Sequence, residues 1–337
     1  MRIAAITREL AIMQQHLPKV MFYKAVTTVR SVSSIAPRHV YSHDGDKKED
    51  QALLAPINYV YQACSKDGRL EFNNAFNYWL KVPQNKFDEI QDLVQILYNV
   101  SLMIDDIQDS STLRSTVPAA HHLYEMGATI ICGLYAINIV YEKINALNHP
   151  EALRVFLDVM NTSYRGQGIE IYWRNNYICP SETEYRKMAD GKISLFVKMF
   201  VSLLQLFSNC KEDFAHLLTT INIYYQIRND YFNLYHKEFT TDSNFADDIS
   251  SGTFTFPVIH AIRNHPEDQQ IIHILRRRTK DLCMKRYCIE LLEQFGSFDY
   301  TRATLEEMDK QIRKEIQRLG GNPLLVKCMD DLLDWKQ

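Results

Sequence analysis

Three aspartates stand at the end of an apolar segment in the first third of the chain. Asp105 and Asp109 are four residues apart, so on a helix their side chains lie on one face, with Asp106 beside them. Two carboxylates that converge on one point repel each other unless a cation lies between them. Hard oxygen ligands favour Mg²⁺, which usually also takes phosphate oxygens and water. The pattern predicts a magnesium site; the alternative is an acidic helix end in solvent, which the helix dipole disfavours at a C-terminus.

A second polar face occurs in the segment 221–238. Gln226, Asn229, Asp230 and Asn233 follow the spacing i, i+3, i+4 and i+7, which places their side chains on one face of a predicted helix. Apolar residues surround this face, so a purely solvated surface is a poor alternative. We expect its oxygen-bearing side chains to complement the first carboxylate cluster.

Cations near these two clusters are candidates for binding an anionic substrate. Arg114 follows the aspartates closely, and Lys192 stands in an otherwise apolar stretch. Lys66 and Arg69 lie in a turn before a predicted helix, whose backbone N–H groups add partial positive charge. This pair could hold an anion, although two such residues taken alone are more often ordinary surface charges.

The segment 164–177 combines polar side chains with glycine. Gln167 and Glu170 are three residues apart on a predicted helix that Gly166 and Gly168 weaken, since mid-helix glycine costs about 1 kcal/mol relative to alanine. Glycine there permits either close approach of a ligand or tight packing against another helix. The sequence leaves both interpretations open.

The composition indicates a mostly helical globular protein. Glycine (11) and proline (10) are scarce among 337 residues, and apolar residues recur at helical spacing. A net charge of -3 gives no footprint for nucleic acid, and no apolar run reads as long and charge-free enough for stable membrane insertion. Seven scattered cysteines indicate a reducing compartment rather than a disulfide framework.

The N-terminus differs from the rest of the chain. Residues 1–49 form a basic extension with clustered serines, which predicts either a targeting segment or a disordered tail. We expect a cytoplasmic protein, with a mitochondrial location as the alternative. Residues 50–337 are predicted to form one folded domain.

The polar motifs resemble those of a known enzyme family. Residues 105–109 (DDIQD), followed by LRSTVPAAH, resemble the first aspartate-rich motif of trans-isoprenyl diphosphate synthases. GQGIEIYWRNNY, YYQIRNDYFNL and the tail FGSFDYTRATLEEM with GGNP are more similar still to animal geranylgeranyl diphosphate synthases. The resemblance covers residues 50–337 and implies an isoprenoid-synthase catalytic domain: an all-α bundle with a deep central cavity, usually in a homodimer.

The resemblance also implies a ligand set, in which about three Mg²⁺ ions hold an allylic prenyl diphosphate at the mouth of the cavity. The implied metal ligands belong to the two polar motifs: Asp105, Asp106, Asp109, Asn229 and Asp230. The implied substrate contacts are polar residues and one apolar one: Lys66, Arg69, Arg114, Lys192, Gln167, Gln226 and Val100. The residues expected to carry catalysis are Asp105, Asp109, Arg114 and Lys192.

The positions implied for a second substrate depart from the family pattern. The family joins isopentenyl diphosphate to an allylic diphosphate, and by position it would use Lys66, Arg69, residue 98 and residue 115. Lys66 and Arg69 match, but Tyr98 replaces a histidine and Ser115 replaces an arginine. Each lost charge-assisted contact to phosphate costs about 1.5–3 kcal/mol. The second-substrate site is therefore predicted to be weakened.

The allylic site departs in another way. Ser243 and Thr253 replace two family lysines, and Asn229 replaces the first aspartate of the second motif. Asparagine can still bind Mg²⁺ through its carbonyl oxygen. An Asn-Asp start is also typical of class I terpene synthases, although Asn233 and Lys237 stand where that motif has a hydroxyl residue and a glutamate.

These features together predict a class I terpene synthase, a lyase descended from a geranylgeranyl diphosphate synthase. It would ionise an allylic diphosphate with Mg²⁺ and release diphosphate with an acyclic monoterpene such as ocimene. Val100, Ser101 and Phe76 are expected to line the apolar cavity. Val100 stands where related synthases have alanine, which favours geranyl diphosphate; plain core packing is the alternative. Two other interpretations stay open: a working geranylgeranyl diphosphate synthase and a non-catalytic regulatory subunit.

Overall fold

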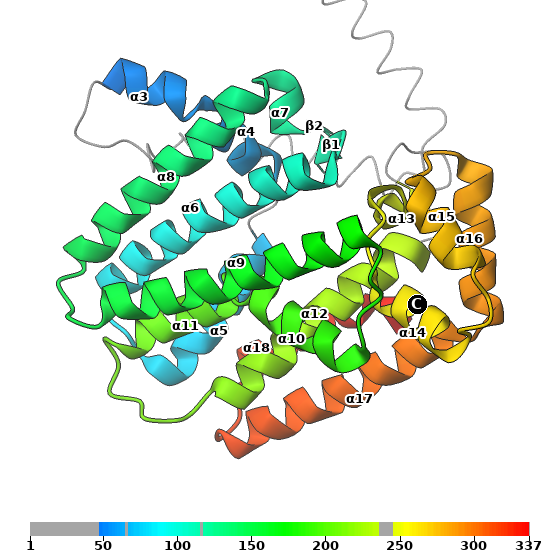
Figure 1. Cartoon of the computed structure of the whole chain (residues 1–337). Helices are drawn as coiled ribbons and strands as arrows, with labels where there is room; N and C mark the ends of the chain where they lie inside the picture. The colour runs from blue at the N-terminus through cyan, green and yellow to red at the C-terminus, as the bar shows by residue number, and fades with distance from the viewer. Residues whose placement is uncertain (1–46, 65–66, 115–116, 236–244, 337) are drawn as a thin grey trace, which may run out of the picture. The chain divides into compact units, whose positions relative to one another are not determined.

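The helix that carries the first aspartates, α6 (Gln84–Asp109), runs through the middle of the structure (Figure 1). It begins directly after Pro83, and most of its apolar side chains are buried. It ends because Ser110 adopts a left-handed conformation with a φ of 55° and donates its N–H to the carbonyl oxygen of Asp106. The aspartates therefore stand on the last two turns of a buried helix.

The computed structural model describes residues 47–64, 67–114, 117–235 and 245–336, with the backbone alone for residues 47 and 67–70. The described residues belong to one compact unit, His43–Gln337. Several predictions concern residues outside the described ones: most of the 1–49 extension, and Lys66, Ser115, Lys237 and Ser243. The side chain of Arg69 is likewise outside them.

Helices form nearly all of the described unit, so the predicted all-α class is confirmed. The first half comprises α3 (Lys47–Leu53), α4 (Ala55–Ala63), α5 (Asp67–Leu80), α6, α7 (Ala120–Leu123), α8 (Met126–Ala146), α9 (Ala152–Asn176), α10 (Glu182–Ile193) and α11 (Val197–Gln205). The second half comprises α12 (Ala215–Tyr235), α13 (Asp247–Ser251), α14 (Phe256–Asn264), α15 (Gln270–Arg277), α16 (Leu282–Gln294), α17 (Ser297–Arg318), α18 (Pro323–Asp331) and a final 3₁₀ turn, η3 (Leu333–Lys336). Two short antiparallel strands, β1 (Leu113–Arg114) and β2 (Val117–Pro118), form a small hairpin after α6.

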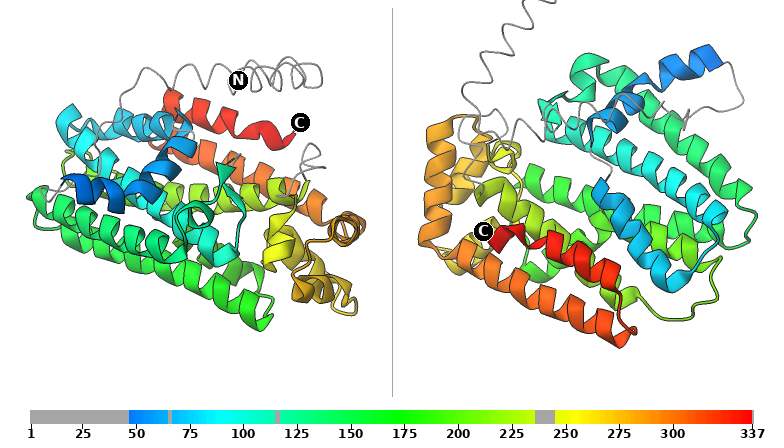
Figure 2. Two further views of the ribbon diagram at one scale, coloured as in Figure 1. Left: turned by 90° about the horizontal axis from the view of Figure 1, so that it is seen from above. Right: turned by 180° about the vertical axis from the view of Figure 1, so that it is seen from behind.

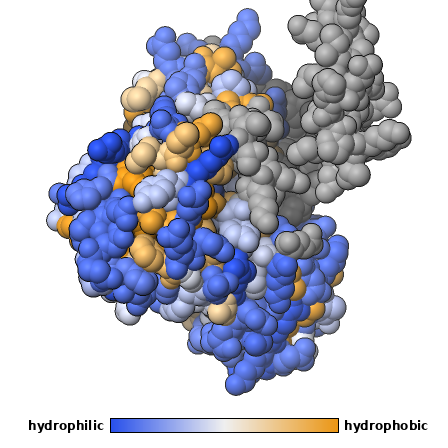
Figure 3. Space-filling model, turned by 90° about the vertical axis from the view of Figure 1, so that its right-hand side faces the viewer, coloured by the Kyte–Doolittle hydropathy of each residue, from blue (hydrophilic) through white to orange (hydrophobic). Residues whose placement is uncertain are grey.

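The long helices pack side by side (Figures 1 and 2). Helix α6 packs against α8, α9 against α10, and α12 against both α10 and α17. The ends of α6, α9 and α12 that carry the polar motifs all lie on the right in Figure 1, near α13. Figure 3 looks onto this side, where hydrophobic side chains reach the surface among hydrophilic ones.

Helices α9 and α10 touch through their backbones at two glycines. A Cβ placed on Gly166 would lie 2.5 Å from the backbone nitrogen of Lys192 and 2.9 Å from the carbonyl carbon of Gly191. A Cβ on Gly168 would meet nothing within 4 Å. Of the two interpretations that the sequence left open, close helix packing is thus the correct one for Gly166.

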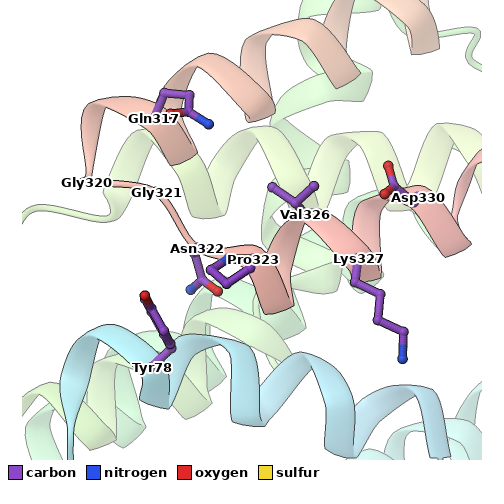
Figure 4. Close-up of a pocket in the computed structure, with 9 residues that line it drawn as sticks. All are labelled: Tyr78, Gln317, Gly320, Gly321, Asn322, Pro323, Val326, Lys327 and Asp330. Atoms are coloured by element: carbon purple, nitrogen blue, oxygen red, sulfur yellow. The ribbon is translucent and has the colours of Figure 1, made fainter.

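The turn between α17 and α18 is fastened to α5 (Figure 4). Gly320 and Gly321 have φ values of 88° and 80°, a conformation that favours glycine. Trp79 donates its Nε1 hydrogen to the carbonyl oxygen of Gly321 at 3.0 Å, and Asn322 donates to the carbonyl of Ala75 at 2.7 Å. A shallow pocket of about 420 Å³ lies over this turn and shares no lining residue with the cavity described below.

Helix α8 corrects one expectation about membranes. By length and composition it is apolar enough to cross a bilayer, contrary to the prediction that no run would be. In the structure it packs against α6, and a Cβ on its Gly133 would lie 3.4 Å from side-chain atoms of Met103 and Ile104. In this structure, α8 is therefore one of the packed helices of the bundle.

Candidate active site

A cavity of about 520 Å³ lies among α6, α8, α9 and α12. One end of it is polar and the other apolar. The polar end is lined by Asp105, Asp109, Arg114, Gln167, Lys192, Gln226, Asn229, Asp230, Asn233 and Asp248. Residues from distant parts of the chain thus meet around one space, and nearly all the predicted polar site residues with described side chains are among them.

Asp105 and Asp109 share the cavity face of α6, as their spacing predicts. Gln167 donates to Asp105 Oδ1 at 3.0 Å, and Arg114 Nη2 lies 3.6 Å from Asp105 Oδ2. Lys192 Nζ is 4.0 Å from Asp105 Oδ1. Cationic and neutral donors therefore surround the first carboxylate at the polar end of the cavity.

Asp106 is placed differently, and its predicted role as a metal ligand is corrected. Its side chain is 1% exposed, does not line the cavity, and accepts hydrogen bonds from Nε (3.0 Å) and Nη2 of Arg114. One residue step turns a helix by about 100°, which carries this carboxylate away from the face of Asp105. Arg114 also donates to the carbonyl oxygen of Leu102 at 3.2 Å. Asp106 thus fixes the guanidinium of Arg114 at the cavity edge.

Lys192 is held by a buried acid from the neighbouring helix. Its Nζ lies 2.6 Å from Glu170 Oε2, and Glu170 is 7% exposed. Burial alone would lower the pKa of Lys192, but the charges of Glu170, Asp105 and Asp109 outweigh it and raise that pKa. The lysine therefore presents a full positive charge to the cavity.

Helix α12 supplies the opposite wall. All four residues of its predicted polar face line the cavity: Gln226, Asn229, Asp230 and Asn233. Asp230 is 3% exposed and accepts hydrogen bonds from the Tyr185 hydroxyl at 2.6 Å, Gln226 at 2.7 Å and the backbone N–H of Phe256 at 2.8 Å. Neutral donors thus hold this carboxylate in place.

Two charged residues at the site escaped the sequence prediction. Asp248 lines the cavity from the first turn of α13. Burial, followed by the charges of Asp230 and Asp109, raises its pKa well above the usual range. Arg174, on the last turn of α9, forms a hydrogen-bonded ion pair with Asp109. The signals present were the DD pair at 247–248 and the arginine in IYWRNN.

The donor set at the polar end fits Mg²⁺ shared with a phosphate ligand. Burial and the charge of Asp105 raise the pKa of Asp109 to about 6, so carboxylates crowd here without enough compensating charge. Among the described side chains, no three His, Cys, Asp or Glu come close enough together to hold an ion by themselves. Mg²⁺ is usually bound by one or two carboxylates together with substrate phosphates. Asp105 and Asp109 on one wall, with Asp248 and Asn229 on the other, supply such oxygens.

The deep end of the cavity is apolar and aromatic. Val100 and Ser101 line it as predicted, together with Tyr98 and Gly133. Phe76 does not, and this prediction is wrong. Its side chain is fully buried elsewhere, in an aromatic cluster with Phe72 and Trp79 of α5 and with Phe214, which lies just before α12. Helix α5 packs against α11 and α18, and Phe76 belongs to the apolar side chains buried on this helix.

Comparison with known proteins agrees with this geometry. The family model described as polyprenyl synthetase matches residues 50–292. The chain belongs to the polyprenyl synthetase family. A protein named terpene synthase from Matsumurasca onukii is 47% identical over 294 residues, which cover 87% of this chain and 97% of the relative. Proteins named geranylgeranyl pyrophosphate synthase are also similar: that of Mucor circinelloides f. lusitanicus is 37% identical over 287 residues (85% of this chain, 95% of the relative) and that of Dictyostelium discoideum 36% over 285 (85% and 94%).

Membership of the polyprenyl synthetase family makes the chain an enzyme of isoprenoid metabolism that acts on prenyl diphosphates. The family generally uses Mg²⁺, in keeping with the oxygen donors at the cavity mouth. The predicted relation to trans-isoprenyl diphosphate synthases is confirmed. The relatives of this chain include proteins of both names, terpene synthase and geranylgeranyl pyrophosphate synthase.

Proposed function

We propose that this polyprenyl synthetase family protein is a class I terpene synthase, which ionises an allylic prenyl diphosphate without joining it to a second substrate. One observation carries the proposal: Tyr98, on the same helix as Asp105, lines the cavity with an aromatic ring. The family resemblance implies that a condensing enzyme has a histidine at this position, which contacts the second diphosphate. The 47% identity to a protein named terpene synthase supports the same conclusion.

The polar end would act on the leaving group. Asp105 and Asp109, with Asn229 and Asp248 opposite, would hold Mg²⁺, whose positive charge neutralises a departing diphosphate. Lys192 and Arg114 would bind diphosphate oxygens. Their fixed positive charges would stabilise the leaving group as the C–O bond breaks and its electron pair leaves with the oxygen. The apolar end excludes water from the resulting cation. Transfer of a proton from carbon to the released diphosphate then gives an acyclic hydrocarbon.

The proposed substrate is the ten-carbon geranyl diphosphate, and the proposed product is an acyclic monoterpene such as ocimene. Val100 is only 5% exposed and lines the cavity opposite Gly133, whose Cβ position lies 3.6 Å from a methyl group of Val100. The two helices therefore approach closely at this level. A cavity that is narrow at this level supports a ten-carbon substrate rather than a twenty-carbon one.

A second candidate function is geranylgeranyl diphosphate synthesis, in which isopentenyl diphosphate is added to an allylic diphosphate. The relatives of that name and the retained Lys66 and Arg69 in the sequence favour it. A purely regulatory subunit is a weaker proposal, because it has no use for the clustered carboxylates of the cavity.

We further propose that the chain acts as a homodimer in the cytoplasm, with a mitochondrial location as the alternative. Helices α8 and α9 pack together, and several of their large apolar side chains are exposed without lining the cavity: Ile131, Leu153, Leu157 and Tyr172. Exposed apolar side chains of this kind are typical of a protein interface. Light scattering tests it: Leu157→Glu should give a monomer, whereas Leu282→Glu, at an exposed position on α16, should not.

One incubation separates the candidate functions. The purified protein is given geranyl, farnesyl or geranylgeranyl diphosphate with Mg²⁺, each with and without isopentenyl diphosphate, and Asp105→Ala serves as the inactive control. Hydrocarbon or alcohol formed without isopentenyl diphosphate supports the terpene synthase. Longer diphosphates formed only when isopentenyl diphosphate is present would establish the transferase instead. No turnover under any condition would favour the regulatory subunit.

A further inference from the structure

Helix α16 buries a lysine that the proposed reaction does not use. Lys285, near the start of α16, is 2% exposed and does not line the cavity. Its Nζ donates to the carbonyl oxygen of Phe245 at 2.6 Å and lies 3.6 Å from Asp247 Oδ1. Burial of an ammonium group costs free energy unless hydrogen bonds or an opposite charge compensate it. An apolar side chain of similar length would avoid that cost, so packing alone does not account for a lysine at this position.

The groups that Lys285 contacts belong to the start of α13, the short helix that carries Asp248. Phe245 lies two residues before α13, and Asp247 is the first residue of this helix. Asp248 follows directly and lines the polar end of the cavity. Helices α13, α15 and α16 lie on the same side of the structure (Figure 1). Lys285 therefore holds, from outside the cavity, the backbone segment to which Asp248 belongs.

The other end of α13 is tied to the same support. The Ser250 hydroxyl donates to the carbonyl oxygen of Thr279, between α15 and α16, at 3.0 Å. A Cβ on Gly252, the residue after α13, would lie 3.3 Å from the carbonyl oxygen of Leu275 on α15. A helix of five residues is too short to be stable by itself. These contacts with α15 and α16 therefore fix where α13 lies.

On the cavity side, α13 is joined to α12 by a single printed side chain of its polar face. The backbone N–H of Asp248 donates to Asn233 Oδ1 at 3.2 Å, and both residues line the cavity. Asn233 thus uses its side-chain oxygen to place Asp248. The acid is held between α12 on one side and the contacts of Lys285 on the other.

We propose that Lys285 is a positioning residue for the metal site: it fixes the start of α13 so that Asp248 shares the cavity with Asp105 and Asp109. The inference rests on the proposed function, in which these carboxylates hold Mg²⁺ against the diphosphate. Because Lys285 does not line the cavity, its removal should weaken the joint binding of Mg²⁺ and diphosphate and leave the rate at saturating Mg²⁺ unchanged.

Three variants separate this role from plain packing. Lys285→Met removes the ammonium group and keeps a side chain of similar length. Lys280→Met removes a charge from an exposed position just before α16, and Cys288→Ala truncates a fully buried side chain one turn further along α16. For each variant we would measure the binding of inorganic diphosphate with Mg²⁺ by calorimetry, the Mg²⁺ concentration that gives half-maximal turnover of geranyl diphosphate, kcat at saturating Mg²⁺, and the melting temperature in EDTA.

In Lys285→Met, diphosphate binding with Mg²⁺ should weaken about tenfold, because a charged hydrogen bond is lost, and the half-maximal Mg²⁺ concentration should rise to match. The kcat at saturating Mg²⁺ should stay near the wild-type value. Lys280→Met should behave as wild type, and Cys288→Ala should lower only the melting temperature.

A second background tests whether Lys285 acts through Asp248. In Asp248→Asn, the further change Lys285→Met should weaken diphosphate binding no more, since the carboxylate that the lysine positions is already gone. If Lys285→Met does not fold, Ser250→Ala decides, because it removes another hydrogen bond that ties α13 to the same support. An unchanged Mg²⁺ response in that variant would then overturn the role.

A folded Lys285→Met protein with wild-type diphosphate binding and Mg²⁺ response would overturn the positioning role and leave the terpene synthase proposal intact. So would a further loss of binding in the Asp248→Asn background, or an equal loss in Cys288→Ala. A wild type that only lengthens diphosphates with isopentenyl diphosphate would refute the terpene synthase proposal, while the binding measurements still decide the role of Lys285. A wild type that binds no diphosphate with Mg²⁺ would refute both.

Discussion

The guanidinium of Arg174 lies against the carboxylate of Asp109, and it also donates to the carbonyl oxygen of Gln108 at 2.8 Å. The Arg174 side chain is 5% exposed and that of Asp109 is 26% exposed, so this contact joins the last turn of α9 to the last turn of α6 with the arginine buried and the aspartate partly exposed. Breaking a fully buried ion pair by removing one partner costs about 3–5 kcal/mol; the cost is smaller here, because water reaches the carboxylate that is left without its partner. The arginine therefore positions the last aspartate of the motif.

Arg174→Ala should lower the free energy of unfolding by about 2 kcal/mol and weaken the joint binding of Mg²⁺ and diphosphate. Arg174→Lys should restore part of both effects, since it keeps a charge but loses the second hydrogen bond. Urea unfolding and calorimetric titration measure them. Arg165→Ala, at an exposed position on the same helix, is the control. Unchanged binding in Arg174→Ala would show that Asp109 does not depend on this contact.

Asp105→Ala should abolish ionisation, because Asp105 and Asp109 are the carboxylates of α6 that face the cavity together. Turnover of geranyl diphosphate below about a tenth of wild type is expected, together with a lost response to Mg²⁺. Asp88→Ala, at an exposed position on the same helix, should keep full turnover. If Asp105→Ala keeps more than that tenth, the motif is not the catalytic metal site.

The long-range contacts of the site explain what sequence reasoning reached and what it missed. Helical spacing was enough to predict that Asp105 and Asp109 share a face, because that relation is local. Arg174 meets Asp109 across 65 residues of chain, so nothing local indicates their pairing. Asp106 was wrongly assigned as a metal ligand because it belongs to the aspartate-rich motif. Its contact with Arg114 depends on how the chain turns after α6, which the motif does not indicate.

Restoring the weakened second-substrate pocket should raise condensation with isopentenyl diphosphate. Tyr98→His and Ser115→Arg together return two polar or charged phosphate contacts, so the gain should exceed that of either single change. Chain-length analysis of the diphosphate products measures it. If the double variant makes no more elongated product than wild type, lost phosphate contacts are not the cause of weak condensation with isopentenyl diphosphate.

Val100→Ala should move the substrate preference from geranyl towards geranylgeranyl diphosphate, because it removes two methyl groups from a cavity wall. Competition between the two substrates in one assay gives the ratio of kcat/KM values directly. Val94→Ala is a suitable control, since Val94 is buried on the same helix but does not line the cavity. A wild type that already prefers the longer substrate would contradict the assignment of a ten-carbon product.

The titration of Asp109 predicts how stability depends on pH in the metal-free protein. Its pKa is raised from 3.8 to about 6, so between these values the folded state binds more protons than the unfolded state. Stability contributed by this group therefore falls as pH rises through that window. The melting temperature of Asp109→Asn minus that of wild type, both measured in EDTA, should rise from about pH 4 to about pH 6 and then level off. The variant also loses the partner of Arg174, which shifts this difference by a constant amount and leaves its dependence on pH unchanged. A flat or falling difference would contradict the raised pKa.

The backbone contact between Gly166 and Gly191 has a consequence for how such an enzyme can evolve. Because main chain touches main chain there, the location of Lys192 is set by the path of two helices and not by the side chains that fill the hydrocarbon end. Substitutions at Tyr98 or Val100 can therefore change the hydrocarbon product while the residues that bind the diphosphate keep their positions. Natural variation should be nearly absent at the two glycines and frequent among the residues that line the apolar end of the cavity.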